Sequence, residues 1–394
     1  MNKMKTGLLL LTVCACLMTV ACAEPAFTVT EQEYMLLQKY KRLEQIIDVI
    51  EDAYLFEYDP DALMEGAALG LLGALGDNYS FYYTIAAMEH EEEAITGEYG
   101  GIGVEVFPNP NDMTITIRRV FFGTPAQQAG LRAGDKIIAI DGEEMTAYDL
   151  NLAVTMMRGI LGETVRLTIL RQGELEPLEI ECVRATVQTE AITYEMLEAG
   201  IGYIQVHFFE GNAMPQFEAA RESLQADGIR GLVLDLRNNP GGFITLAVDV
   251  ANVFLDESLV AVTEDKYGRL LEYYTDEGSW DIPMVVLVNE YSASASEIVA
   301  AALRDNGAAK LAGVQTYGKG IVQAVYPFAD NTGMQLTTDY WLTPNGERVH
   351  GVGLVPDVEV ELAEEAISED YMPVREKDNQ LAAAVALLRE ELSR

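Results

Sequence analysis

The hydrophobic pattern of the chain changes its period twice. Between Glu31 and Tyr54, apolar residues recur at steps of four and three, which predicts a helix with one apolar stripe. Asp59-Pro60 has the residues of a helix N-terminus and predicts a second helix that continues to about Leu75. An apolar stripe needs an apolar partner. That partner is either the second helix or a second copy of the chain.

Short alternating segments follow and predict a small mixed β module between about Glu98 and Arg184. After Gly200, strands alternate with helices, and segments such as Gly231–Leu234 are apolar without a break, which is typical of a sheet covered on both faces. The predicted fold class is therefore α/β and multidomain, with an N-terminal helical segment, an inserted β module and an α/β core. The expected later elements are strands at 202–208, 232–236 and 284–289, and helices at 215–225, from about 245, at 294–304 and at 380–392.

The N-terminus has the pattern of a secretory signal. Lys3 and Lys5 precede an apolar run that ends at Ala21-Cys22-Ala23, and these three residues fit a small-x-small cleavage site with a mature start at Glu24. The same residues approximate a lipoprotein signal with Cys22 lipidated, and an uncleaved membrane anchor is a third reading. In each case we expect an exported, extracytoplasmic protein, which is periplasmic, at the cell surface or secreted.

Composition narrows the class of protein. The chain has 394 residues, of which 49% are hydrophobic, so two or three folded domains are expected. With 63 acidic and 26 basic residues the formal net charge is −37, which disfavours nucleic acid as a partner because phosphates are bound by Lys and Arg. Cys182 is the only cysteine beyond residue 22 and cannot form an internal disulfide, so the fold depends on packing.

Two familiar kinds of hydrolase site are absent from the sequence. The three histidines are His90, His207 and His350, and none is part of a helical zinc-binding HExxH motif. No G-x-S-x-G nucleophile turn occurs either. The sequence therefore predicts no metal and no cofactor, and it gives no histidine an obvious role as a base.

Three segments carry candidate chemistry, and each has an ordinary structural explanation. Ser294 lies at the predicted N-terminus of a helix, where free N–H groups favour a forming oxyanion, but with Glu297 it also fits a capping box. Lys319 is flanked by glycines before an apolar strand, which suits either a base with a lowered pKa or a flexible turn. The turn at Gly241 and Gly242 either contributes a donor to an oxyanion hole or is a plain tight turn.

Taken together, the three segments resemble the carboxy-terminal processing peptidases, a serine peptidase family (S41) with a Ser/Lys dyad. The family places its nucleophile in S-A-S-A-S-E, its lysine 25 positions later in G-K-G, and a glutamine four positions after the lysine. This spacing selects Ser294, Lys319 and Gln323 here, and the resemblance implies that Gln323 orients the lysine. The family's L-R-x-N-P-G-G turn matches Leu236 to Gly242, so the implied oxyanion donors are Gly241 or Gly242 together with Ala295. Ile321 stands where many members have serine.

A second match extends the resemblance over nearly the whole mature chain. Gly101-Ile102-Gly103-Val104 is similar to the carboxylate-binding loop of a PDZ domain, and Thr124 to Asp135 matches a further PDZ motif. A glycine-rich turn can direct backbone N–H groups at a terminal carboxylate while the next strand pairs with the peptide. The implied organisation is a signal at 1–23, a helical region at 24–97, a PDZ domain at 98–185, a protease core of the ClpP/crotonase-like type at 186–362 and a C-terminal helical segment at 363–394.

The resemblance implies an exported serine endopeptidase that cleaves proteins near apolar C-termini, with the PDZ domain recognising or gating these tails. It also implies a regulatory partner, and the N-terminal helices suggest a homodimer. Two rival hypotheses are a tail-binding protein on an inactive protease scaffold and a serine hydrolase that uses His207 or His350 as its base.

Overall fold

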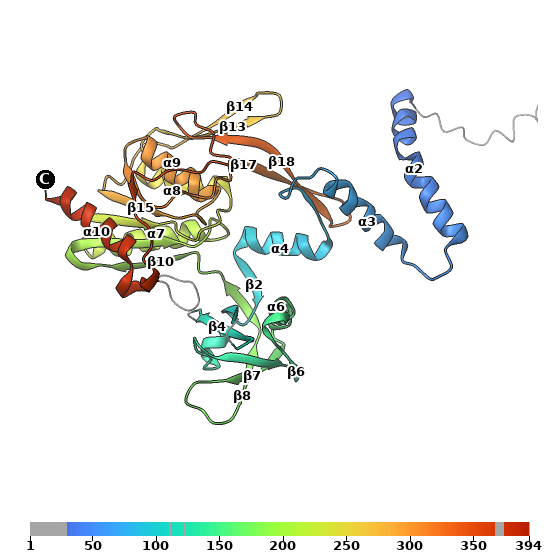
Figure 1. Ribbon diagram of the computed structural model, residues 1–394, viewed down its shortest axis with the longest axis horizontal. Coiled ribbons are helices and arrows are strands. Elements are labelled where there is room, and N and C mark those ends of the chain that lie inside the picture. The colour runs from blue at the N-terminus through green and yellow to red at the C-terminus, as the bar shows by residue number, and fades with distance from the viewer. Residues whose placement is uncertain (1–29, 110–111, 122, 367–373, 394) are drawn as a thin grey trace, which may run out of the picture. The chain divides into compact units, whose positions relative to one another are not determined.

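The computed structural model describes residues 30–109, 112–121, 123–366 and 374–393, and the signal expected at 1–23 lies outside them. The chain divides into two units between Gly66 and Ala67. The first unit contains helix α2 (Glu31–Ala53), which matches the predicted helix within one residue, and the start of α3 (Pro60–Gly73), which crosses the division (Figure 1). In the described residues no helix is both long enough and apolar enough to span a membrane.

The apolar stripe of α2 is largely uncovered. Tyr40 is 54% exposed and Tyr54 is 56% exposed, and Ile47 and Ile50 are only partly buried. Large exposed apolar side chains on one element commonly mark an interaction surface.

The core of the second unit is a six-stranded sheet in which four central strands are parallel. The strand order is β10 (Ile192–Met196), β11 (Ile201–Val206), β12 (Gly231–Asp235), β15 (Met284–Val288), β16 (Ala309–Gly313) and β19 (Val358–Glu359). Only β10 runs antiparallel to its neighbour. Every residue of β12 and β15 is buried, as expected for strands covered on both faces.

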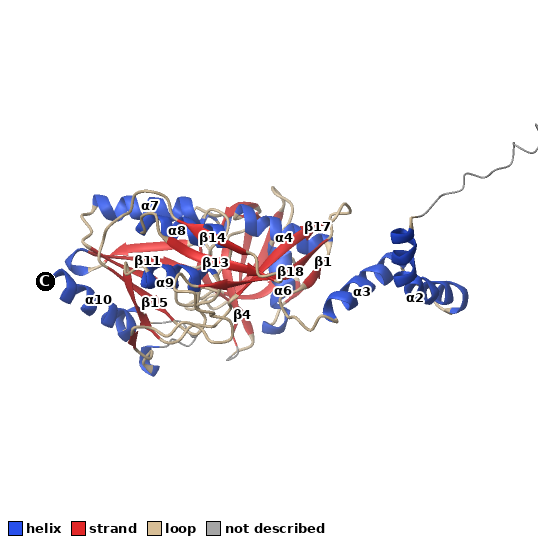
Figure 2. Cartoon of the chain, turned by 90° about the horizontal axis from the view of Figure 1, so that it is seen from above, coloured by secondary structure: helices blue, strands red, loops and turns tan. Residues whose placement is uncertain are grey.

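Helices cover both faces of this sheet (Figure 2). On one side lie α7 (Ala213–Ala226), α8 (Ile244–Phe254) and α9 (Ala295–Asp305), and on the other lies α10 (Asn379–Leu392). Side chains alternate along each strand, so Leu232 and Leu234 pack toward α7–α9 while Val233 packs toward α10. The carboxyl ends of β12 and β15 therefore deliver their following turns to the same edge of the sheet.

A second sheet, which was not predicted from the sequence, stands beside the first. It is antiparallel and consists of β1 (Phe81–Tyr83), β18 (Gly333–Leu342), β13 (Leu259–Asp265) and β14 (Leu270–Tyr274), with β17 (Ile321–Pro327) also paired to β18 (Figure 1). Helix α4 (Ile85–Thr96) follows β1. Strand β17 begins two residues after Lys319, so the β17–β18 hairpin continues directly from the lysine turn.

The predicted β module is present and has its own core. The two-stranded pair β2 (Glu98–Gly101) and β9 (Ala185–Gln188) forms its stem. The module itself contains β3 (Val104–Asn109), β4 (Thr114–Val120), α5 (Pro125–Gln128), β5 (Lys136–Ile140), β6 (Glu143–Glu144), α6 (Leu150–Met157), β7 (Thr164–Leu170) and β8 (Leu178–Val183). Cys182 is buried in this core, and burial raises the pKa of its thiol to about 11.

Candidate active site

Ser294 occupies a strained turn between β15 and α9. Its φ of 55° lies in the left-handed region that residues other than glycine rarely adopt, and such strain is found where the surrounding structure enforces it. The enforcing neighbour is the turn at Gly241. A Cβ atom added to Gly241 would lie 2.7 Å from the Cβ of Ser294. Only glycine allows the two turns to approach this closely.

The serines on either side of Ser294 have structural roles. The Ser292 hydroxyl donates to the carbonyl of Leu236 at 2.8 Å, and the Ser296 hydroxyl donates to the carbonyl of Asn239 at 3.0 Å. Both side chains are fully buried. Of the three serines, Ser294 is the one that lines an open cavity, which agrees with the choice made from spacing.

The turn after β12 contains two glycines, and in the described residues only the first has its backbone N–H in a hydrogen bond. The Gly241 N–H donates to the side-chain oxygen of Asn239 at 2.9 Å, while the carbonyl of Gly241 accepts from Phe209. Gly242 has a φ of 138°, and a Cβ atom there would lie 2.1 Å from the carbonyl oxygen of Phe209. Within the described part of the chain, the amides of Gly242 and Ala295 have no hydrogen-bond acceptor.

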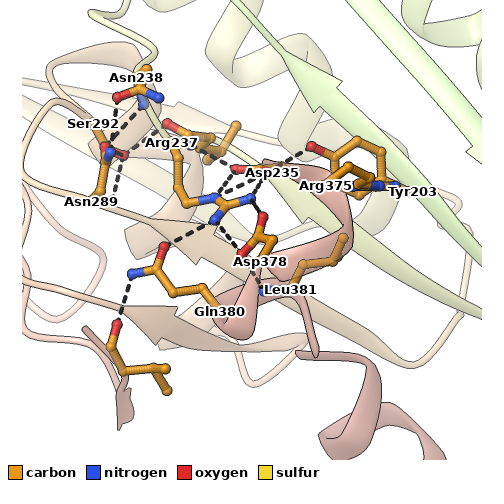
Figure 3. A network of polar contacts seen from close by, with 12 residues as sticks. Tyr203, Asp235, Arg237, Asn238, Asn289, Ser292, Arg375, Asp378, Gln380 and Leu381 are labelled. Atoms are coloured by element: carbon orange, nitrogen blue, oxygen red, sulfur yellow. Dashed lines mark hydrogen bonds and ion pairs between the residues drawn. The ribbon is translucent and has the colours of Figure 1, made fainter. Parts of the chain in front are cut away.

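A buried network of charges anchors the start of this turn (Figure 3). Arg237 is 3% exposed and pairs with Asp235 at 2.6 Å and with Asp378 at 2.7 Å, and it also donates to Gln380 at 2.9 Å. Burial by itself lowers the pKa of Arg237, but the two carboxylates more than offset this and hold it well above its usual range. Since Asp378 and Gln380 open α10, the C-terminal helix is tied to the turn that faces Ser294.

The next residue of the turn is held by hydrogen bonds to the residue that follows β15. The Asn238 N–H donates to the side-chain oxygen of Asn289 at 2.9 Å, and the Asn289 amide donates back to Asn238 at the same distance (Figure 3). Asn238 itself has a φ of 60°, a conformation that asparagine tolerates better than most residues. The segment between Arg237 and Gly242 is therefore held at several points.

Glu297 joins the nucleophile turn to the lysine turn. It is fully buried, and its carboxylate accepts from the backbone N–H groups of Ser294 at 2.9 Å, Gly318 at 2.8 Å and Lys319 at 2.9 Å, and from the Thr316 hydroxyl at 2.5 Å. Burial raises the pKa of Glu297 although these four donors oppose the rise. From the sequence, Glu297 was recognised only as a capping residue and as the last position of S-A-S-A-S-E, and neither signal indicated its contacts with the lysine turn.

Lys319 lies partly buried in the turn before β17. Burial lowers the pKa of its amine, while the nearby Glu297 carboxylate acts in the opposite direction. The flanking glycines are needed because a Cβ at Gly318 would lie 2.8 Å from the Gly353 nitrogen, and one at Gly320 would lie 2.3 Å from the His350 nitrogen. The turn is thus closely packed, unlike a flexible surface loop.

The structure brings the three candidate catalytic side chains to one cavity of about 330 Å³. Its lining includes Ser294, Lys319 and Gln323 together with Gly241 and Gly242, and its walls contain the apolar residues Pro240, Phe243, Ile244, Ile298, Ile321, Val322, Val325 and Trp341. In the described residues no hydrogen bond joins the three catalytic candidates to one another. Instead, Gln323 donates to the Thr337 hydroxyl at 3.3 Å.

The histidines lie elsewhere. His207 is mostly buried, shares a hydrogen bond with Thr193 at 3.2 Å, and has its pKa lowered to about 4 by burial. The His350 ring packs against Tyr340. Neither residue lines the cavity around Ser294. The side chain of His90 lies outside the described part of the molecule.

The candidate peptide-binding loop connects β2 to β3. Ile102 and Gly103 form the turn between Gly101 and Val104, and Gly103 has a φ of 82° with Thr124 packed where a Cβ would be. The loop borders a cavity of about 70 Å³ whose lining is Tyr99, Ile102, Gly103, Val104, Val106, Val154, Met157 and Arg158. A small, mainly apolar pocket beside a glycine turn has the form required to bind the end of a peptide.

Comparisons with known proteins identify the family to which this fold belongs. The model of peptidase family S41 matches residues 200–360, that of the PDZ domain matches 100–182, and that of the activating protease CtpB N-terminal domain matches 20–87. The carboxy-terminal-processing protease of Bartonella bacilliformis is 36% identical over 84% of this chain and 77% of its own length. The carboxy-terminal processing protease CtpA of Bacillus subtilis is 33% identical over 83% of this chain and 70% of its own.

Among solved structures, the photosystem II D1 C-terminal processing protease superposes with a TM-score of 0.51 at 25% identity, covering 87% of this chain and 96% of that one. The fold and these relatives define a serine peptidase with a PDZ domain. The chain belongs to the carboxy-terminal processing peptidases of family S41. The expected family, fold class and enzyme class are thereby confirmed.

Proposed function

We propose that this peptidase cleaves peptide bonds through a dyad of Ser294 and Lys319. The observation that carries the proposal is that both side chains line one cavity while a single buried carboxylate, Glu297, binds the backbone of both. Neutral Lys319 takes the hydroxyl proton as Ser294 attacks the substrate carbonyl, and the proton passes to the leaving amine. Water then cleaves the acyl-enzyme, and Ser294 regains its proton.

The oxyanion is stabilised by backbone amides in this proposal. We assign Gly242 and Ala295 as donors because their N–H groups are not engaged, whereas Gly241 donates to Asn239. Removing one such donor typically costs about 2.7–4 kcal/mol of transition-state stabilisation. Gln323 orients Lys319 during the reaction by accepting from the amine with its Oε1 atom, while its Nε2 atom donates to the Thr337 hydroxyl.

We assign the PDZ domain to residues 98–185. It receives apolar substrate tails at Gly101, Ile102, Gly103 and Val104. Its pocket of about 70 Å³ suits a small apolar terminal side chain. The protease core then takes 186–362, the helical region 24–97, and the C-terminal segment 363–394. The D1 protease and the other relatives are named for processing C-termini, which supports a tail as substrate.

We further propose export through the signal at 1–23 and a homodimer through the N-terminal helices. The largely exposed stripe of α2 supports a second copy as its partner. A regulatory partner that acts through the PDZ domain belongs to the same proposal.

The dyad is tested by cleavage of an unfolded protein with an apolar C-terminus by the mature chain. Ser294→Ala and Lys319→Ala should each abolish cleavage, while Lys310→Ala, which alters an exposed lysine on β16, should keep it. Cleavage that survives Lys319→Ala rejects the lysine base. Binding of the tail without turnover by the unaltered protein favours the tail-binding scaffold.

A further inference from the structure

The amine of Lys319 lies against an aromatic ring from a distant part of the chain. Its Nζ atom is 4.9 Å from the centre of the Tyr79 ring and over the face of that ring. Tyr79 belongs to the loop between α3 and β1. The face of an aromatic ring attracts an ammonium ion through the ring quadrupole, and a neutral amine gains little from it.

The Tyr79 ring is held in place by the backbone around it. The Tyr79 N–H donates to Asp77 at 2.9 Å, and its carbonyl accepts from the Gln335 amide at 3.0 Å. The next residue, Ser80, donates to Asp77 at 2.6 Å and accepts from the backbone N–H of Thr337 at 2.9 Å. The loop is therefore fastened to β18, which pairs with the strand that follows Lys319.

The hydroxyl group of Tyr79 also meets the lysine turn. It lies 3.4 Å from the hydroxyl of Tyr317, whose backbone N–H donates to the carbonyl of Ser292 at 3.1 Å. Tyr79 thus connects, through Tyr317, to the turns that carry both candidate catalytic residues. The position of the ring over the amine is a built part of the site and not an incidental surface contact.

We propose that Tyr79 is a positioning residue that binds the ammonium form of Lys319 and so sets how readily this lysine loses its proton. The proposal deepens the proposed function and rests on it, because a general base must be neutral before it can take the serine proton. Lys319 has to lose the attraction of the ring when it deprotonates. The ring then no longer holds the amine, which is free to turn toward Ser294.

Other titratable groups lie around the amine and the ring. Glu297 from α9 acts on the amine itself. Tyr317 and Asp77 interact with Tyr79, Glu91 and Glu210 line the same cavity as Lys319, and the His350 ring packs against Tyr340. Burial lowers the pKa of Lys319, and Glu297 raises it. The Tyr79 ring acts in the same direction as Glu297, so removing the ring should lower the pKa further and increase the neutral fraction at a given pH.

The test measures the reactivity of the Lys319 amine directly. An amine-reactive acylating reagent labels only neutral lysine, and mass spectrometry reports labelling at Lys319 relative to the exposed Lys310. The background is Ser294→Ala, which prevents self-cleavage. At a pH below the pKa, Tyr79→Leu should increase the relative labelling of Lys319 about fivefold, and Tyr79→Phe should leave it unchanged because it keeps the ring.

A graded series separates the ring from the packing that it provides. Phenylalanines with one, two or more fluorine atoms at position 79 keep the size of the ring while they progressively weaken its attraction for cations. Labelling of Lys319 should rise with each fluorine. This series decides the matter if Tyr79→Leu fails to fold. Labelling that does not change along the series, or that rises as much in Tyr79→Phe as in Tyr79→Leu, overturns the proposal.

The labelling result is independent of turnover. If Lys319→Ala retains cleavage while the fluorine series changes labelling, the general base is wrong and the Tyr79 contact stands. If cleavage requires Lys319 but labelling is constant along the series, the dyad stands and the role of Tyr79 is rejected.

Discussion

The two turns that flank Ser294 are held in opposite ways. The turn that follows Arg237 is anchored by ion pairs between side chains that are almost completely buried. The turn that carries Lys319 has its backbone fixed by Glu297, but the lysine amine itself rests on the face of the Tyr79 ring. In the described residues, the amine makes no hydrogen bond and no ion pair.

This difference matches what the proposed mechanism requires of each side. Oxyanion donors work best when they are already in place, because reorganisation at the moment of reaction would reduce their benefit. A general base must instead lose a proton and gain one in every cycle, so its charged form cannot be held by strong ion pairs. We infer that the molecule combines a rigid oxyanion side with an adjustable base.

The largest effect is expected from a substitution in the ion-pair network of Arg237, at the residue that opens α10. Asp378→Ala removes one carboxylate from Arg237 and leaves the guanidinium buried with only Asp235 as its charged partner. Truncating one partner of a buried ion pair typically costs about 3–5 kcal/mol. Urea denaturation should show this loss of stability, and Asp281→Ala, which alters an exposed aspartate before β15, is a control that should change little. Equal stability of the two variants would show that the C-terminal helix does not support the turn.

A smaller effect, shared by both sides, is expected at Glu297. Glu297→Gln keeps the size of the side chain but turns one acceptor oxygen into a donor, which faces backbone N–H groups. An unsatisfied buried group costs about 1–3 kcal/mol. The loss of the negative charge should also lower the pKa of Lys319, so the rise of kcat/KM with pH should move to lower pH.

Urea denaturation and a pH–rate profile check the two consequences of Glu297→Gln separately. A profile that moves to higher pH would contradict the electrostatic role of Glu297. A change in stability without any movement of the profile would restrict Glu297 to fastening the backbone.

The pH dependence of kcat/KM in the unaltered protein tests whether Lys319 acts as the base. Burial lowers the pKa of Lys319, and the base acts when neutral, so kcat/KM should rise with pH by up to about tenfold per unit. It should level off below the ordinary lysine pKa of about 10.4. A profile that falls with rising pH across this range, measured where the fold is intact, would exclude a lysine base.

The sequence predicted the parts of the molecule whose pattern is local. The parallel strands appear as unbroken apolar runs and the helices as capped or periodic segments, so α2, α9 and α10 were placed within one residue or so of their observed ends. The second sheet was missed because its two hairpins, β13–β14 and β17–β18, are joined only by the long-range pairing of β13 with β18. Their strands also include many half-buried residues, which blurs the alternation.

The candidate site was predictable from the sequence only in part. The spacing of Ser294, Lys319 and Gln323 follows a known family, and the structure places all three around one cavity. The contacts of Glu297 with Gly318, of Asp378 with Arg237 and of Tyr79 with Lys319 join residues that are 21, 141 and 240 positions apart. No local pattern in a single sequence encodes such contacts.

The smallest expected effect concerns the link between Gln323 and Thr337. If Gln323 orients Lys319 by accepting from the amine with its Oε1 atom, the hydrogen bond from its Nε2 atom to the Thr337 hydroxyl holds the amide in place for that role. Thr337→Val keeps the shape and removes the acceptor, and one such bond is worth about 0.5–1.5 kcal/mol, so kcat/KM should fall a few-fold. Thr337→Ser keeps the hydroxyl and should behave like the unaltered protein. The fall should vanish in a Gln323→Ala background, because no glutamine is then left to be held. A fall that persists in that background would mean that Thr337 acts through Asp77, whose pKa is lowered by hydrogen bonds from Ser80 and Thr337, and not through Gln323.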